Sequence, residues 1–169
     1  MSTTLRTAVR LSGTYLALGD LASMRIVGTW RTCDDGVARP VLQGVLFGAR
    51  GQPLTEWFLI DTGADRTVLS GSVYFRLGIT GRLPDTGYRL MGIGGATDFV
   101  LLTTEVEFTR DDGQPVRVRG ELSAFTEPTA TDFSVLGRDV LDSFDLVISR
   151  HKNEIWLLAG IHRYQLRTE

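Results

Sequence analysis

The sequence contains few metal-binding side chains and no excess of basic charge. Its one cysteine, Cys33, cannot form an internal disulfide, so folding does not depend on an oxidising compartment. Cys33 and the two histidines, His151 and His162, are too few for an ordinary zinc site, and we expect no metal or cofactor. Lysine and arginine number 18 against 20 acidic residues, so the chain lacks the basic field that nucleic-acid binding usually needs.

Long hydrophobic runs are also missing. No segment approaches the roughly 20 apolar residues that a membrane-spanning helix requires. Arg6 and Arg10 precede an apolar run at residues 11–19, as in a signal peptide, but residues 12–14 are polar or small and Asp20 ends the run. We therefore expect a soluble, cytoplasmic protein without a membrane partner.

Glycine, by contrast, is abundant. The chain has 19 glycines among 169 residues, above the usual share of about 7%, and only 5 prolines. This composition indicates many tight turns rather than a low-complexity linker. With 43% hydrophobic and 22% charged residues, a chain of this length can form one folded domain with its own core.

The apolar pattern predicts strands along most of the chain. Residues 41–47 form an apolar run, a turn follows at 49–53, and residues 57–60 are typical of a fully buried strand. Val68 and Leu69 continue the extended structure. The residues before Pro40 are less regular, with one candidate strand at 24–31 and a turn at 33–36.

Three hairpins are predicted in the second half, the first at residues 88–91 and 96–102 on either side of a glycine cluster. Valines and Phe108 alternate with glutamates at 105–108 and with arginines at 116–119, across a turn at 111–113. The register that buries the valines sets the glutamates opposite the arginines, each pair contributing a few tenths of a kcal/mol on a solvated face. Residues 146–148 and 155–158 predict a final hairpin.

Short helices are predicted at two places only. Residues 71–78 have a capping serine, Ser72, apolar residues at helical spacing and a closing glycine. Residues 139–144 also predict a short helix, with Val140, Leu141 and Phe144 on one side. The fold class is therefore all-β with one or two short helices.

An aspartate directly follows the apolar strand at residues 58–60. The segment consists of Asp61, Thr62, Gly63, Ala64 and Asp65. Burial disfavours the charged form of a carboxylate, so a buried Asp61 would need an explanation. Gly63 lets the backbone bend sharply, and the Thr62 hydroxyl can hold the bend through hydrogen bonds. From these residues alone, a strand-ending turn and a functional Asp61 remain equally open.

The second candidate segment is a glycine cluster, formed by Met91, Gly92, Ile93, Gly94 and Gly95. Gly92 and Gly94 have the first spacing of a dinucleotide-binding loop, but extended residues follow where that loop requires a helix. An ordinary tight hairpin remains open. Three glycines in four positions also suit a hairpin tip that presents backbone donors to a ligand.

The third candidate segment follows the apolar pair at residues 135–136. It consists of Gly137, Arg138 and Asp139. An arginine at the start of a helix can place its guanidinium against a carboxylate elsewhere in the domain. Taken alone, a plain helix N-terminus explains the segment adequately.

In this order and spacing, the three segments resemble the retropepsins, the retroviral-type aspartic proteases and their cellular and bacterial relatives. Residues 61–65 resemble the family's catalytic loop, residues 92–95 its flap tip, and residues 136–139 the Gly-Arg-Asn/Asp motif before its only helix. The resemblance covers roughly residues 40–158. It implies a retropepsin-like half-barrel with a flap hairpin.

The resemblance also implies an activity. In the family, two copies of the catalytic aspartate share one proton, and one of them activates a water molecule while the other donates a hydrogen bond to the scissile carbonyl. Asp61 would be that residue. Thr62 would cross-link the two loops, and the Gly63 carbonyl would accept a hydrogen bond from the substrate backbone.

The remaining segments would bind substrate or support the site. Asp65 would bind the substrate main chain and pair with Arg138, and the amide of Ile93 would hold a bridging water over the substrate. Substrate binding is expected at Ala64, Asp65, Met91, Gly92, Ile93, Gly94 and Gly95. Structural support is expected from Gly137, Arg138 and Asp139.

One such loop makes only half of a site. A second Asp-Thr-Gly occurs at residues 85–87, but it follows the turn-like segment 81–84 rather than a buried strand, so we interpret it as a loop before the flap. The second aspartate is therefore expected from another chain, in a two-fold symmetric homodimer.

We expect an aspartic endopeptidase that cleaves protein or peptide substrates. The alternative is a catalytically silent relative that uses the same fold to bind peptides or to dimerise. A nucleotide-binding or hydrolase domain has little support, because neither a phosphate-loop lysine motif nor Gly-x-Ser-x-Gly occurs.

The domain boundaries follow from the same resemblance. Residues 39–158 form the protease-like domain, residues 1–38 an N-terminal extension of unclear role, and residues 159–169 a C-terminal tail. The extension could replace the family's dimer interface, cover the site as a pro-segment, or be removed by the enzyme itself.

Overall fold

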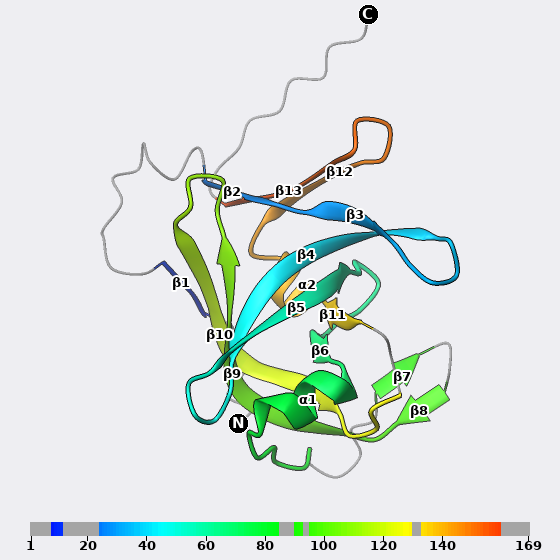
Figure 1. Ribbon diagram of the computed structural model, residues 1–169, viewed down its shortest axis with the longest axis vertical. Helices are drawn as coiled ribbons and strands as arrows, with labels where there is room; N and C mark the ends of the chain where they lie inside the picture. The colour runs from blue at the N-terminus through cyan, green and yellow to red at the C-terminus, as the bar shows by residue number, and fades with distance from the viewer. Residues whose placement is uncertain (1–7, 12–23, 85–89, 93–94, 130–132, 160–169) are drawn as a thin grey trace, which may run out of the picture.

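The structure, a computed structural model, describes residues 8–11, 24–84, 90–92, 95–129 and 133–159 (Figure 1). Several predictions lie outside these residues, namely those for Ile93 and Gly94, for the second Asp-Thr-Gly at 85–87, and for His162. Within the described residues the fold is all-β with two short helices, as predicted.

The elements are the following. The strands are β1 (Ala8–Leu11), β2 (Met24–Val27), β3 (Thr29–Thr32), β4 (Ala38–Phe47), β5 (Pro53–Ile60), β6 (Val68–Leu69), β7 (Leu90–Gly92), β8 (Gly95–Thr97), β9 (Phe99–Thr109), β10 (Pro115–Phe125), β11 (Ser134–Leu136), β12 (Asp145–Ser149) and β13 (Glu154–Ala159). The helices are α1 (Gly71–Leu77) and α2 (Arg138–Leu141).

The largest sheet closes on itself. Around the ring β4 pairs with β5, β5 with β11, β11 with β6, β6 with β10, β10 with β9, and β9 with β4 again. The β5–β11 and β6–β10 pairs are parallel, and the other pairs are antiparallel. The main core includes Phe58 and Phe108, whose ring centroids lie 5.9 Å apart in an edge-to-face arrangement.

The β9–β10 hairpin has the register that the charge pattern predicted. Val106 lies opposite Val118 and Glu107 opposite Arg117, and the valines are buried. The Arg117 Nε lies 2.8 Å from a carboxylate oxygen of Glu107 and 3.5 Å from one of Glu105. The charges therefore occupy the outer face of a hairpin whose inner face fills the core.

Two strands that precede the predicted domain boundary join the same core. β2 pairs with β13 in a second sheet of order β12–β13–β2, and β3 pairs with β4. Met24 and Ile26 in β2 are buried within the main core. The domain division at residue 38 stays a prediction, but residues 24–32 pack with the strands that follow it.

Helix α1 ends where predicted but begins with a different cap. Ser70, not Ser72, is the N-cap residue, and its Oγ accepts a hydrogen bond from the Val73 amide at 3.4 Å. Gly78 closes the helix at φ 63°, a left-handed conformation that glycine adopts without strain. The Ser72 prediction was wrong because the extended backbone of a cap belongs to Ser70.

The prediction of a fully buried strand at 57–60 was half right. Phe58 and Ile60 are buried, whereas Trp57 and Leu59 are only partly buried. The two sets alternate, as expected for a strand with one face toward the core and the other face partly open.

No helix among the described segments is both long and apolar enough to traverse a bilayer.

Candidate active site

Asp61 lies at the end of β5, where the chain leaves the barrel wall. β11 runs parallel to β5 with Leu136 opposite Ile60, and the Asp61 amide donates a hydrogen bond to the Leu136 carbonyl at 3.1 Å. This bond extends the alternation of β5 by one residue, so Asp61 belongs to the partly open face of Trp57 and Leu59 rather than to the core face. Asp61 is accordingly half-exposed.

The backbone of the loop holds one oxygen of the Asp61 carboxylate. The Gly63 amide donates a hydrogen bond to Asp61 Oδ1 at 2.8 Å, and the Ala64 amide donates to the Asp61 carbonyl at 3.2 Å. The second oxygen, Oδ2, accepts no hydrogen bond from any described residue. The carboxylate is thus oriented through one oxygen while the other stays available.

The segment at 137–139 holds this loop in place through backbone hydrogen bonds. The Arg138 amide donates to the Ala64 carbonyl at 2.8 Å, and the Asp139 amide donates to the Asp65 carbonyl at 3.3 Å. The Arg138 guanidinium also forms an ion pair with the Asp65 carboxylate, which raises the pKa of Arg138. Both side chains are exposed, so the pair contributes less to stability than the backbone hydrogen bonds around it.

Thr67 supports the loop of Asp61, although no motif in the sequence pointed to it. Its amide and its hydroxyl donate to the same oxygen of Asp139, at 2.8 and 2.7 Å, and the Thr67 Oγ1 accepts from the Gly137 amide at 3.0 Å. Thr67 is only 1% exposed. Its hydroxyl therefore links the loop after β5 to the start of α2 inside the protein.

Gly137 allows this close approach because it has no side chain. A Cβ at this position would lie 2.3 Å from the Arg66 carbonyl carbon and 2.8 Å from the Thr67 nitrogen, both backbone atoms. Its φ of −95° is ordinary, so the requirement for glycine is one of space alone.

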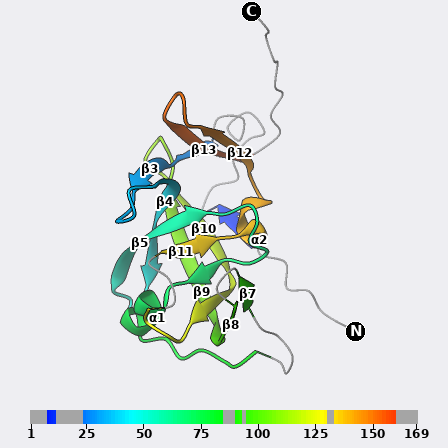
Figure 2. The same ribbon diagram turned by 90° about the vertical axis from the view of Figure 1, so that its right-hand side faces the viewer.

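Strands β7 and β8 pair as the predicted hairpin, in their own two-stranded sheet. Met91 lies opposite Ala96 and Gly92 opposite Gly95. Figure 1 places this hairpin on the same side of the barrel as the segment between β5 and β6, and Figure 2 looks onto that side. The backbone geometry thus confirms a hairpin, while the role of its tip remains a prediction.

Apolar side chains accompany Asp61 on the same face, and sequence reasoning did not identify them. Leu59 and Val135 lie directly opposite each other in the parallel β5–β11 pair, and both are partly exposed. Phe133, two residues before Val135, is partly exposed as well. Alternation along β11 would have revealed this face only if its parallel partner had been known.

The site offers carboxylate chemistry without a metal cluster of its own. Among the described segments, no group of three or more His, Cys, Asp or Glu side chains is arranged to hold a metal ion. Three carboxylates lie in or next to the loop. Asp65 forms an ion pair with Arg138, and Asp139 accepts a hydrogen bond from the Thr67 hydroxyl. The Asp61 carboxylate has only the backbone amide of Gly63 as a hydrogen-bond partner among the described residues.

No family model matches the sequence. No curated protein matches it either. Among solved structures, an EIAV protease bound to an inhibitor is similar to this chain, with 29% identity over 62% of this chain and 86% of the other, and a TM-score of 0.42. A retropepsin-like aspartic protease from Rickettsia conorii shares 18% identity over 79% and 89% of the two chains, with a TM-score of 0.48.

The second of these two proteins is a member of the family that the three sequence segments resemble.

Proposed function

We propose that the protein is an aspartic endopeptidase whose active site forms between two copies of the chain. The observation that carries the proposal is the Asp61 carboxylate itself, half-exposed, oriented by the Gly63 amide through one oxygen and open at the other. A carboxylate held this way can bind and polarise a water molecule.

The second aspartate comes from a second copy. Asp65 is paired with Arg138 and Asp139 accepts hydrogen bonds from Thr67, so among the described residues of this segment Asp61 is the one available carboxylate. A two-fold axis beside the loop would bring the two Asp61 side chains face to face, since identical residues meet only about such an axis. Thr62 is exposed and makes no hydrogen bond with described residues, so its hydroxyl is available for the partner loop.

The chemistry needs only these two carboxyl groups and water. Two carboxylates about 3 Å apart share one proton, because both cannot remain ionised. The ionised member removes a proton from the water, whose oxygen attacks the scissile carbonyl carbon, while the protonated member donates a hydrogen bond to the carbonyl oxygen. The amine leaves with a proton returned from the pair. A rate optimum below neutral pH follows, because a fully ionised pair has lost the shared proton.

The β7–β8 hairpin would cover the substrate. Its strands are paired up to Gly92 and Gly95. Backbone groups of such a hairpin can hydrogen-bond an extended peptide without selecting its side chains. In this proposal the hairpin acts as the flap, and Met91 and the glycines bind substrate through their backbone.

The experiment compares the wild-type protein with Asp61→Asn on a diverse peptide library at several pH values. The variant keeps the Oδ1 acceptor for Gly63 but cannot share the proton, so cleavage should fall at least about a hundredfold while the unfolding midpoint stays unchanged. Asp145→Asn is the matched control, because Asp145 is exposed on β12, away from the loop. Full cleavage by Asp61→Asn would refute the proposal. Peptide binding without cleavage by the wild type would favour the silent peptide-binding module instead.

A further inference from the structure

Arg31 lies on the same face of the sheet as Asp61. In the β3–β4 pair Arg31 is opposite Arg39, and in the β4–β5 pair Val41 is opposite Leu59. Residues directly opposite each other share a face, and so do residues two apart along a strand. Arg31 therefore shares a face with Leu59 and with Asp61, which continues the alternation of β5.

Two aromatic rings hold the Arg31 guanidinium on that face. Its central carbon lies 5.3 Å from the ring centroid of Trp57 and 5.9 Å from that of Phe133. Both rings lie close in sequence to the site, because Trp57 is on β5, four residues before Asp61, and Phe133 directly precedes β11. Arg31 is nevertheless exposed. Contacts of this kind fix the position of a cation without neutralising it.

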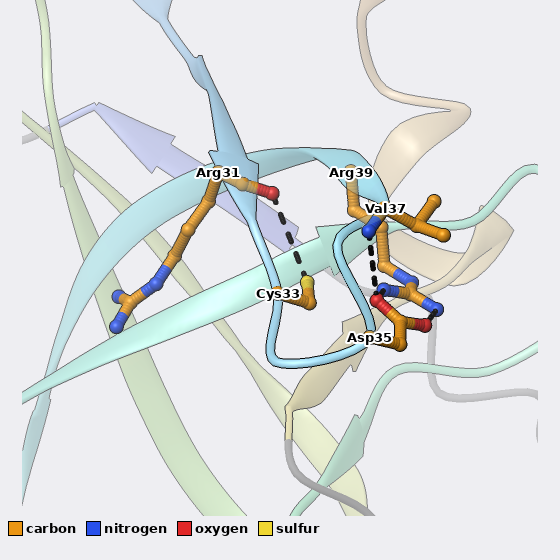
Figure 3. Close-up of polar contacts among 5 residues, drawn as sticks. All are labelled: Arg31, Cys33, Asp35, Val37 and Arg39. Carbon is orange, nitrogen blue, oxygen red and sulfur yellow. Dashed lines mark hydrogen bonds and ion pairs between the residues drawn. The ribbon is translucent and has the colours of Figure 1, made fainter.

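The neighbouring Arg39 provides the contrast. Asp35 accepts hydrogen bonds from both terminal nitrogens of Arg39, at 2.8 and 2.5 Å, which raises the pKa of Arg39 and lowers that of Asp35 (Figure 3). Figure 3 shows the Arg31 side chain diverging from this pair. Arg31 forms no ion pair with any carboxylate of the described segments.

Glu56, the acidic residue beside Trp57 on β5, does not neutralise Arg31 either. Its carboxylate accepts a hydrogen bond from the Ser134 amide at 3.3 Å, and Arg31 influences it only at longer range. The β3–β4 hairpin thus presents an exposed, positioned and unneutralised cation beside the apolar pair Leu59 and Val135.

We propose that Arg31 is a specificity residue that binds an acidic side chain, aspartate or glutamate, of the peptide substrate. The inference rests on the proposed endopeptidase function and adds a substrate class to it. A guanidinium has a planar fork of donors that matches a carboxylate, and its stacking on two rings reduces the freedom lost when the pair forms. The apolar pair beside it would accept uncharged side chains nearer to the scissile bond.

The test measures kcat and KM for peptides that differ only by glutamate, glutamine or lysine at each position in turn, all based on one peptide that the wild type cleaves. Wild type is compared with Arg31→Gln, Arg31→Glu and Arg150→Gln. Arg150 is the matched control, because its guanidinium also lies over a tryptophan, 4.7 Å from the centroid of Trp30, which points to the opposite face of β3.

At one fixed position, the wild type should prefer glutamate over glutamine by about two- to fivefold in kcat/KM, as for a partly exposed charge pair. The preference should appear in KM, vanish in Arg31→Gln, turn to lysine in Arg31→Glu, and persist in Arg150→Gln. A purely structural Arg31 would lower the activity toward all peptides equally.

Two results would overturn the inference, and they differ. Cleavage by the wild type without an acidic preference, or with the same preference in Arg31→Gln, would refute the role of Arg31 and leave the endopeptidase proposal standing. Absence of cleavage of any library peptide by the wild type would refute both.

Discussion

Gly137 is the residue on which the geometry of the loop depends most directly. Its missing side chain lets the start of α2 contact the Arg66 and Thr67 backbone, and no flexible atom is available to move aside. Gly137→Ala should therefore lower the free energy of unfolding by about 1–3 kcal/mol, the cost of an overpacked site. Denaturant unfolding measures this change.

Gly113→Ala is the comparison for Gly137→Ala. Gly113 has φ +81° and open space around it, so alanine there costs only backbone strain, about 1 kcal/mol. Equal losses in the two variants would show that crowding at Gly137 is relieved by a backbone shift. Peptide cleavage should fall in Gly137→Ala only.

Asp139 is the second residue whose role can be isolated. Its Oδ1 accepts two hydrogen bonds from buried Thr67. Asp139→Ala leaves both donors without a partner and should destabilise the fold by about 2–3 kcal/mol, whereas Asp139→Asn keeps an acceptor oxygen and should cost less than about 1 kcal/mol. Unfolding curves of the two variants, measured side by side, decide the matter. A loss as large in Asp139→Asn as in Asp139→Ala would mean that the charge, not the acceptor, holds the loop.

At the scale of elements, β5 carries a titratable residue, Glu56, whose carboxylate accepts a hydrogen bond from the Ser134 amide of the parallel strand β11. Glu56 is partly buried, and its burial raises the pKa of its carboxyl above 4.5 although the Ser134 hydrogen bonds and two arginines oppose the shift. The folded state therefore holds this proton more tightly than the unfolded state, and stability falls as pH rises from about 4.5 through the folded pKa.

Glu56→Gln removes this titration while keeping an acceptor for the Ser134 amide. The variant should match the wild type in unfolding free energy near pH 4 and become more stable than the wild type above the folded pKa, with the difference levelling off there. Urea unfolding at a series of pH values gives the two curves. Parallel curves across the whole range would contradict the assignment to Glu56.

The sequence predicted most helices and strands, but not which distant residues pack against each of them. The β9–β10 hairpin was predictable because Val106 and Val118 alternate with charges, and local alternation determines which face is buried. The partly open face of β5 was not predictable, because Leu59 lies opposite Val135, which belongs to a strand far along the chain. The same holds for Thr67, whose partners lie at the start of α2.

At the scale of the whole molecule, three separate segments predicted a family. The way the strands assemble depends on contacts between residues far apart in the sequence, which local patterns do not predict. β2 and β3 looked like part of an extension, yet they complete the β12–β13 sheet and extend β4. The Asp65–Arg138 pair, inferred only from the resemblance, is present in the structure.

The most demanding prediction concerns two copies of the molecule at once. If each active site uses one Asp61 from each chain, Asp61→Asn chains should inhibit wild-type chains by forming mixed dimers with them. With equal amounts mixed and allowed to exchange, about a quarter of the dimers contain two intact aspartates, and wild-type activity should fall to about half. A tenfold excess of Asp61→Asn should reduce it to about a tenth.

The measurement is made at concentrations where wild-type activity is proportional to protein, so that added chains do not raise the dimer fraction. Asp145→Asn chains, which keep the loop intact, should add their own activity to that of the wild type. On dilution, the specific activity of the wild type should fall as dimers dissociate, together with a decrease in the size measured in solution. Wild-type activity that is insensitive to Asp61→Asn chains and to dilution would mean that a single chain completes the site, and a second acid would then have to be sought within it.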